Sequence, residues 1–300
     1  MWIVLAFVSA FFLGCYDISK KEAVSQNAVI PVLFLNTLFC TLFLSPLVLL
    51  SRFLPELIWG SKIFYVPPVN FETHLYIVLK SIIVLSSWLF GYFAVKHLPL
   101  TITSPINATR PVMTLVGALL IFGERLNLYQ SIGVGLTIVS FALLSVSGKK
   151  EGIRFAHNKW VFFIVLAAVL GAISGLYDKY LMQRFSSTAV QFWYNLYQCV
   201  FMGVIMLLLW YPKRKGNTRF SWKWSIVLVS LFLTIADFVY FYALSLPGAM
   251  ISIVSMVRRS SVLVSFAGGA FIFKEKNLKG KIADLLLIIL AMVFLYLGTK

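Results

Sequence analysis

The chain has 300 residues, of which 60% are hydrophobic and only 12% are charged, and its mean hydropathy is +0.92. Because a soluble domain carries about 25% charged residues, this composition excludes a soluble globular protein and predicts an integral membrane protein. The formal net charge is +16, but the basic residues are scattered in short loops between apolar runs, which indicates membrane orientation and argues against a nucleic-acid partner.

Ten apolar runs follow one another along the chain, and each is close to the length of about 20 residues that a helix needs to cross a bilayer. They lie near residues 2–18, 28–50, 74–96, 98–122, 127–147, 160–182, 189–211, 224–245, 248–273 and 282–298. Their continuity does not fit the short alternating segments of a membrane β-barrel. No Lys or Arg precedes the first run, so we expect a retained helix there and not a signal peptide. The sequence predicts an all-α membrane protein with ten transmembrane helices.

Landmark residues recur in the same order in the two halves of the chain. The matched pairs are Asp17 and Asp178, Asn36 and Asn195, Tyr92 and Tyr240, Arg110 and Arg258, and Glu124 and Glu275. We therefore expect two five-helix repeats, 1–148 and 160–300, joined by a linker over 149–159. Because five is odd, the second repeat enters the membrane from the opposite side. Inverted repeats of this kind are typical of secondary transporters, whose substrate site lies where the repeats meet.

Arginines deep within apolar runs are the first candidate functional residues. Arg110 and Arg258 lie about 15 to 18 Å inside their spans at 1.5 Å per residue, where a charged side chain needs a partner or a cavity. The guanidinium group suits carboxylate or phosphate, so we expect these residues, with the adjacent Arg259, to bind an anionic substrate. The alternative is a structural ion pair with Asp237, near the middle of the eighth span. Because burial favours the neutral form of a carboxyl group, Asp237 is also the expected proton or counter-ion site.

Several polar residues in the spans complete the predicted substrate-binding set. They are Asn36, Asn107, Asn195, Tyr92 and Tyr240. The asparagines also fit interhelical hydrogen bonds, which are common wherever polar groups lie in apolar runs.

Other charged residues have simpler explanations. Lys80 lies close to the predicted start of its span and is expected to extend to the membrane interface. Asp17 and Asp178 are expected to be interfacial carboxylates that pair with neighbouring lysines, for Asp178 with Lys179. Glu124, in a short turn, is expected to remain in water or to cap the next helix.

The sequence carries no signal for an enzyme, a metal site or a cofactor. Its three histidines lie in or beside loops, it has no HExxH motif, and the three cysteines lack metal-binding spacing. The loops are too short for an appended catalytic domain. These observations favour transport over catalysis.

The motifs together resemble the EamA branch of the drug/metabolite transporter superfamily. The resemblance is carried by the Gly-x-Tyr-Asp ending of the first helix with Lys20 and Lys21, by the Leu-Pro turns into the fourth and ninth spans, and by the Phe-Gly-Glu124-Arg and Phe-Lys-Glu275-Lys closures. It implies a carrier in the plasma (inner) membrane that works by alternating access on a small metabolite. Members usually keep both termini in the cytoplasm, whereas the distribution of basic loops here predicts both termini outside.

We therefore expect a secondary transporter for a small, anionic organic metabolite, with that solute and membrane lipids as its partners and with proton coupling left open. Two alternatives remain at this point. One is a flippase for a phosphate-linked lipid, and the other is a non-transporting membrane scaffold or sensor subunit in which the arginines are only structural.

Overall fold

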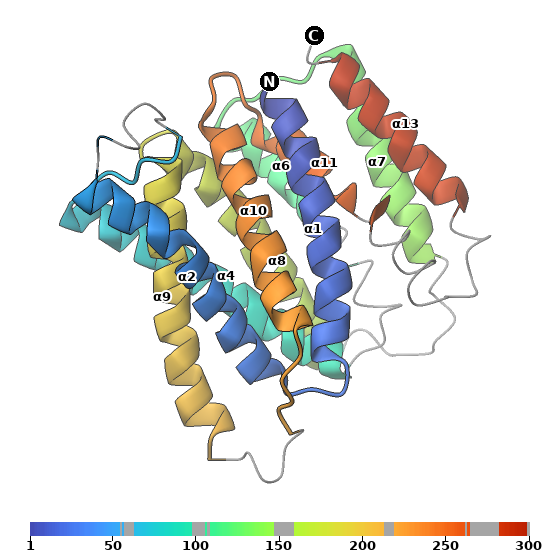
Figure 1. The fold of residues 1–300 in the computed structure, drawn as a ribbon. Helices are drawn as coiled ribbons and strands as arrows, with labels where there is room; N and C mark the ends of the chain where they lie inside the picture. The colour runs from blue at the N-terminus through green and yellow to red at the C-terminus, as the bar shows by residue number, and fades with distance from the viewer. Residues whose placement is uncertain are drawn as a thin grey trace.

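The computed structural model describes residues 1–54, 56, 63–97, 106, 109–146, 159–212, 219–261, 263–264 and 282–298. Within these ranges the chain forms ten α-helices, one in each predicted apolar run (Figure 1). They are α1 (Trp2–Val24), α2 (Val29–Phe53), α4 (Phe71–His97), α6 (Arg110–Ile121), α7 (Leu128–Val146), α8 (Lys159–Met182), α9 (Ser187–Ile205), α10 (Ser225–Ser245), α11 (Ile251–Arg258) and α13 (Ile282–Leu297), and a π-helical turn, η2 (Met206–Trp210), extends α9. Apart from the N–H and C=O groups at its two ends, a helix satisfies its backbone groups within the segment, as a spanning segment must in lipid.

Six of the described helices, namely α1, α2, α4, α8, α9 with η2, and α10, are long and apolar enough to cross a membrane. Shorter apolar helical segments are Arg110–Ile121 of α6, Leu128–Ser140 of α7 and Leu286–Leu297 of α13. The helices α6 and α11, with 12 and 8 residues, occupy only part of the predicted fourth and ninth spans. The remainder of the fourth span and the end of the ninth lie largely outside the described residues, as does most of the predicted linker.

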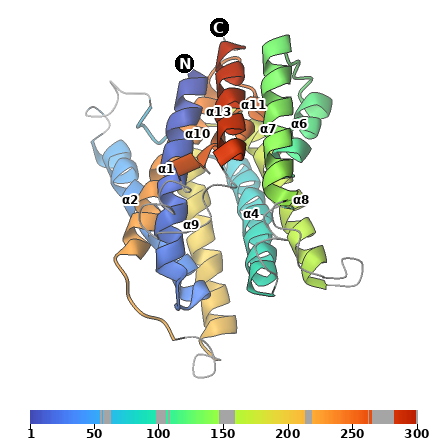
Figure 2. The same ribbon diagram turned by 90° about the vertical axis from the view of Figure 1, so that its right-hand side faces the viewer.

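The helices pack in pairs, and in each main pair one helix comes from the first repeat and the other from the second. The first helix of the first repeat, α1, packs along α10, the third helix of the second repeat, and α8 packs along α4 in the same way. The second helices, α2 and α9, pack against each other, and so do the fifth, α7 and α13 (Figures 1 and 2). These four contacts are therefore related to one another, or to themselves, by exchange of the two repeats.

The direction of the helices shows that the repeats are inverted. Both termini lie at the same end of the molecule, and α1 leads away from that end (Figure 1). The helix α8 starts at the opposite end of the molecule and runs in the reverse sense to α1 (Figure 2). The predicted architecture of two inverted five-helix repeats is confirmed.

The ninth span differs from its prediction as a continuous helix. The helix α11 ends at Arg258, and the next two amides bond three residues back, from Arg259 N to Met256 O at 3.1 Å and from Ser260 N to Val257 O at 2.9 Å. Helical geometry resumes at Ser261. A break at membrane depth is tolerated where the backbone lines a cavity, and hydropathy alone carries no signal for it.

A carboxylate from the first repeat holds the start of α11. Glu124, in the turn after α6, accepts hydrogen bonds from Ile251 N at 2.7 Å, from Ser252 N at 3.2 Å and from the Ser252 hydroxyl. A carboxylate there satisfies free N–H groups and complements the helix dipole. The sequence predicts that Glu124 either remains in water or caps the next helix. It does cap a helix, but this helix, α11, belongs to the other repeat and is not the next one in the chain.

Candidate functional site

A cavity of 340 Å³ lies where the two repeats meet. Its walls come from α1, α4 and α6 of the first repeat and from α8, α9, α10 and the α11 break of the second. The charged residues that line it are Asp17, Lys20, Lys80, Arg110, Asp178, Asp237, Arg258 and Arg259. Basic residues outnumber acidic ones by five to three in this set, so the cavity carries a formal positive excess.

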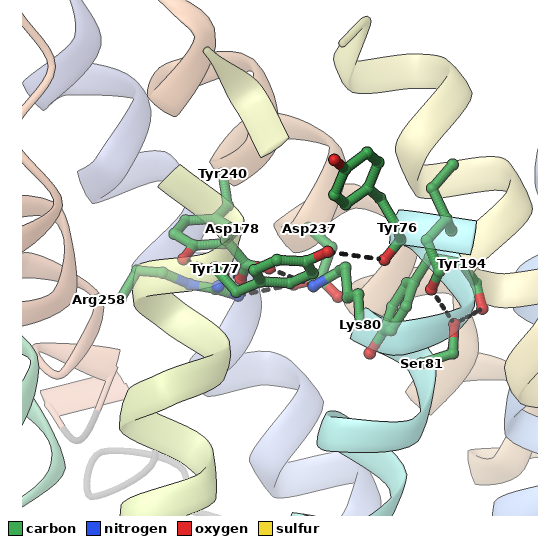
Figure 3. Close-up of polar contacts among 10 residues, drawn as sticks. Tyr76, Lys80, Ser81, Tyr177, Asp178, Tyr194, Asp237, Tyr240 and Arg258 are labelled. Carbon is green, nitrogen blue, oxygen red and sulfur yellow. Dashed lines mark hydrogen bonds and ion pairs between the residues drawn. The ribbon is translucent and has the colours of Figure 1, made fainter. Parts of the chain in front are cut away.

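Arg258 is engaged by Asp237, the structural pair that the sequence left open as an alternative. Its Nη2 donates to Asp237 Oδ1 at 2.8 Å, and its guanidinium carbon lies 4.0 Å from the centre of the Tyr240 ring (Figure 3). The ion pair is partly shielded, with side-chain exposures of 17% for Arg258 and 19% for Asp237. This guanidinium thus already has a counter-charge and an aromatic face within the protein.

A second ion pair, which the sequence did not predict, joins Lys80 of α4 to Asp178 of α8. The Tyr240 hydroxyl donates to the other carboxylate oxygen of Asp178 at 3.2 Å. The Lys80 ammonium lies 4.3 Å from the centre of the Tyr194 ring and 4.9 Å from that of Phe241. Figure 3 shows the two ion pairs side by side, connected through Tyr240.

Two predictions about these residues are wrong. Lys80 does not extend to the membrane interface, since α4 begins at Phe71 and the lysine is only 2% exposed. Asp178 does not pair with the neighbouring Lys179, which instead donates to the Ala249 carbonyl. The signal that could have found the true pair is the presence of opposite charges inside two different apolar runs, because charges at membrane depth seek each other.

Arg110 is held by backbone and hydroxyl groups and not by an acid. It begins α6, where Pro111 fits the first turn because its missing N–H would have no helical partner there. Its Nη2 donates to Ala167 O at 3.0 Å and to Ser87 Oγ at 3.4 Å. Its Nε is buried without a partner among the described residues, and no carboxylate of the described chain forms an ion pair with it.

The space for this guanidinium exists because α8 carries a glycine opposite it. A Cβ atom on Gly171 would stand 2.8 Å from Arg110 Cζ and 2.9 Å from both Nε and Nη1. Gly171 also lines the cavity. The fold therefore places Arg110, which has no acidic partner in the described part of the chain, at the wall of a central cavity.

The remaining predicted site residues fall into three groups. Arg259 and Tyr240 line the cavity with Arg110 and Arg258. Asn36 is 1% exposed and Asn195 is 7% exposed; neither lines the cavity, and Asn36 Oδ1 accepts from Cys40 Sγ at 3.7 Å within α2. Asn107 and the side chain of Tyr92 lie outside the described residues. The structure thus brings the arginines, Tyr240 and Asp237 together, while the two described asparagines lie apart.

Comparison with known proteins places this architecture in a family. The profile of the EamA-like transporter family matches residues 1–146 and again residues 158–297. A curated relative from Archaeoglobus fulgidus, described as an uncharacterized transporter, is 24% identical over 299 residues and covers 98% of each chain. A solved crystal structure shares the fold with a TM-score of 0.73 and 11% identity, over 99% of this chain and 98% of that chain.

Inverted repeats around a charged central cavity define a multi-pass membrane transporter, and the two profile matches agree with the internal repeat. The chain belongs to the EamA-like transporter family of the drug/metabolite transporter superfamily. The predicted resemblance is thereby confirmed, and the protein is a transporter and not an enzyme.

Proposed function

We propose that the protein is a secondary transporter that carries a small, anionic organic metabolite across the plasma membrane by alternating access. The observation that carries the proposal is Arg110, whose guanidinium lines the cavity with a free Nε and without a carboxylate partner in the described chain. A charge at this depth needs compensation. An anionic substrate group supplies it in the geometry that guanidinium binds best.

The other charges of the cavity support an anion over a cation. Asp178 and Asp237 are already occupied by Lys80 and Arg258. A cationic solute would have to displace an internal base from one of these carboxylates. The third acidic residue of the cavity, Asp17, interacts electrostatically with Arg259, whereas an anion meets Arg110 directly. The adjacent positive charge of Arg259 on the cavity wall favours the same class of solute.

The size of the cavity supports a small metabolite. Ligand pockets span about 300 to 1,000 Å³, and the cavity volume of 340 Å³ lies at the lower end of that range. In alternating access, the repeats 1–148 and 160–300 would rock against each other about the linker 149–159. We retain Asp237 as the counter-ion of Arg258 within this cycle.

The direct test is thermal unfolding of the detergent-purified protein against a panel of anionic metabolites. A ligand at a hundred times its dissociation constant adds about 2.7 kcal/mol to the free energy of unfolding. We expect at least one carboxylate- or phosphate-bearing compound to raise the unfolding temperature of the wild type, and Arg110→Gln to abolish that rise.

The matched control is Arg125→Gln, which removes the same charge from an exposed position in the turn after α6. This variant should retain the full ligand-induced rise. A rise that survives in Arg110→Gln at unchanged apparent affinity would contradict the assignment of the anion site.

A further inference from the structure

The two ion pairs of the cavity form one connected network across four helices. Lys80 of α4 binds Asp178 of α8, Tyr240 of α10 donates to Asp178, and the Tyr240 ring packs under Arg258 of α11, which binds Asp237. Figure 3 shows these five side chains gathered in one place, with Lys80 coming from the first repeat and the other four from the second. The network has two basic and two acidic members, so its net charge is zero.

The Lys80–Asp178 pair is the more deeply buried of the two, yet it remains in contact with the cavity. Its side-chain exposures are 2% and 8%, against 17% and 19% for Arg258 and Asp237, and both of its members line the cavity wall. The removal of one partner from a buried pair leaves an uncompensated charge, which is strongly unfavourable. Whatever separates Lys80 from Asp178 must therefore neutralise both of them.

The side chains around Asp178 indicate that its carboxylate is the group that a proton neutralises when Lys80 moves away. The titratable and charged side chains that face it are Lys80 from α4, Tyr194 from α9, Asp237 and Tyr240 from α10, and Arg258 from α11. Arg258 is already bound to Asp237. Lys80 is thus the only one of these cations in direct contact with Asp178. The loss of that contact leaves the Tyr240 hydroxyl as the one remaining side-chain partner of the carboxylate among the described residues.

We propose that Asp178 is the proton site of the transport cycle and that Lys80 exchanges it for the substrate anion. The proposal rests on the proposed function. In the empty cavity Lys80⁺ binds Asp178⁻; in the loaded cavity Lys80⁺ binds the substrate anion, and Asp178 carries a proton taken from the water of the cavity. Summed over Lys80, Asp178 and the anionic group that Lys80 binds, the charge is zero in both states.

Binding of the anion and binding of the proton therefore favour each other, because each removes the penalty that the other would create. When the anion leaves, Lys80 returns to Asp178 and the proton passes to the water on the side of release. One proton then accompanies each anion in the same direction. This moves the proton site from Asp237, where the sequence placed it, to Asp178.

The test uses infrared difference spectroscopy of the protein in lipid vesicles, stepped between alkaline and acidic buffer. It needs no knowledge of the substrate, because a protonated carboxylic acid has its own carbonyl band. Lys80→Gln reproduces the loaded state by removing the positive charge from Asp178. We expect this variant to show a carboxylic-acid band already at neutral pH, and the band to be lost in Lys80→Gln with Asp178→Asn.

The matched control is Lys80→Gln combined with Asp237→Asn, which should keep the neutral-pH band. A Lys80→Gln spectrum without the band, or a band that disappears with Asp237→Asn instead, would overturn the proposal. A retained ion pair in the wild type gives a further check, since Asp178→Asn alone should remove no band at neutral pH. Anion binding is measured separately by the Arg110 thermal shift, so failure of the proton site and failure of the proposed function are distinguishable.

Discussion

Gly171→Ala tests the position of Arg110 without changing any charge. The new Cβ would stand 2.8 Å from Arg110 Cζ and 2.9 Å from Nε and Nη1, so the guanidinium must move. It is the end of a flexible side chain, and Gly→Ala within a helix adds about 0.5–1 kcal/mol of stability; the protein should therefore remain folded. A hydrogen bond to a charged group contributes about 1.5–3 kcal/mol, so the displaced guanidinium should weaken anion binding about tenfold to a hundredfold.

The assay is the concentration of anion needed for half of the maximal rise in unfolding temperature. Gly175→Ala is the matched control, one turn further along α8 and also on the cavity wall, where a Cβ would stand 3.7 Å from Thr114 Oγ1 in ordinary contact. We expect Gly171→Ala to require much more anion than Gly175→Ala. Equal affinities for the two variants would refute the inferred role of the Arg110 position.

Two further predictions concern contacts between the repeats. Gly14→Ala should lower the free energy of unfolding by about 1–3 kcal/mol, because its Cβ would stand 2.8 Å from Val264 Cγ1 and 2.9 Å from the Ser261 carbonyl oxygen. Thermal unfolding measures the effect, and the control is Gly135→Ala, whose Cβ would meet no atom within 4 Å. Equal stability of the two variants would contradict the prediction. Glu124→Ala should lower the free energy of unfolding by about 1–2 kcal/mol, because it removes the cap of α11. Thermal unfolding checks this as well, and a variant that unfolds at the wild-type temperature would contradict the role of the cap.

The sequence predicts the fold well because hydropathy and repetition are local properties of the chain. Each of the ten predicted apolar runs contains a described helix, and the repeated landmarks imply the inverted halves. The break after Arg258 is the main feature of the fold that the sequence does not predict. It depends on the cavity that the helix faces, and a continuous apolar composition conceals it.

The candidate site is predicted in part, because the sequence shows which residues are charged but not which ones meet. The depth of Arg110 and Arg258 is evident from span length, and the alternative pairing with Asp237 follows from the position of Asp237 near the middle of the eighth span. The prediction for Lys80 is wrong because distance from the end of a span does not determine the direction in which a side chain points. The partner of Lys80 lies on a helix of the other repeat, where only tertiary packing brings it near.

The measurement that tests the account most directly is tracer counterflow in proteoliposomes, with the anion that stabilises the wild type in the thermal panel. The account predicts that wild-type protein and Arg125→Gln accumulate the labelled anion, whereas Arg110→Gln reconstitutes equally well and accumulates none. Wild-type accumulation by Arg110→Gln, with unchanged apparent affinity, would show that the anion is bound elsewhere and would contradict the central claim.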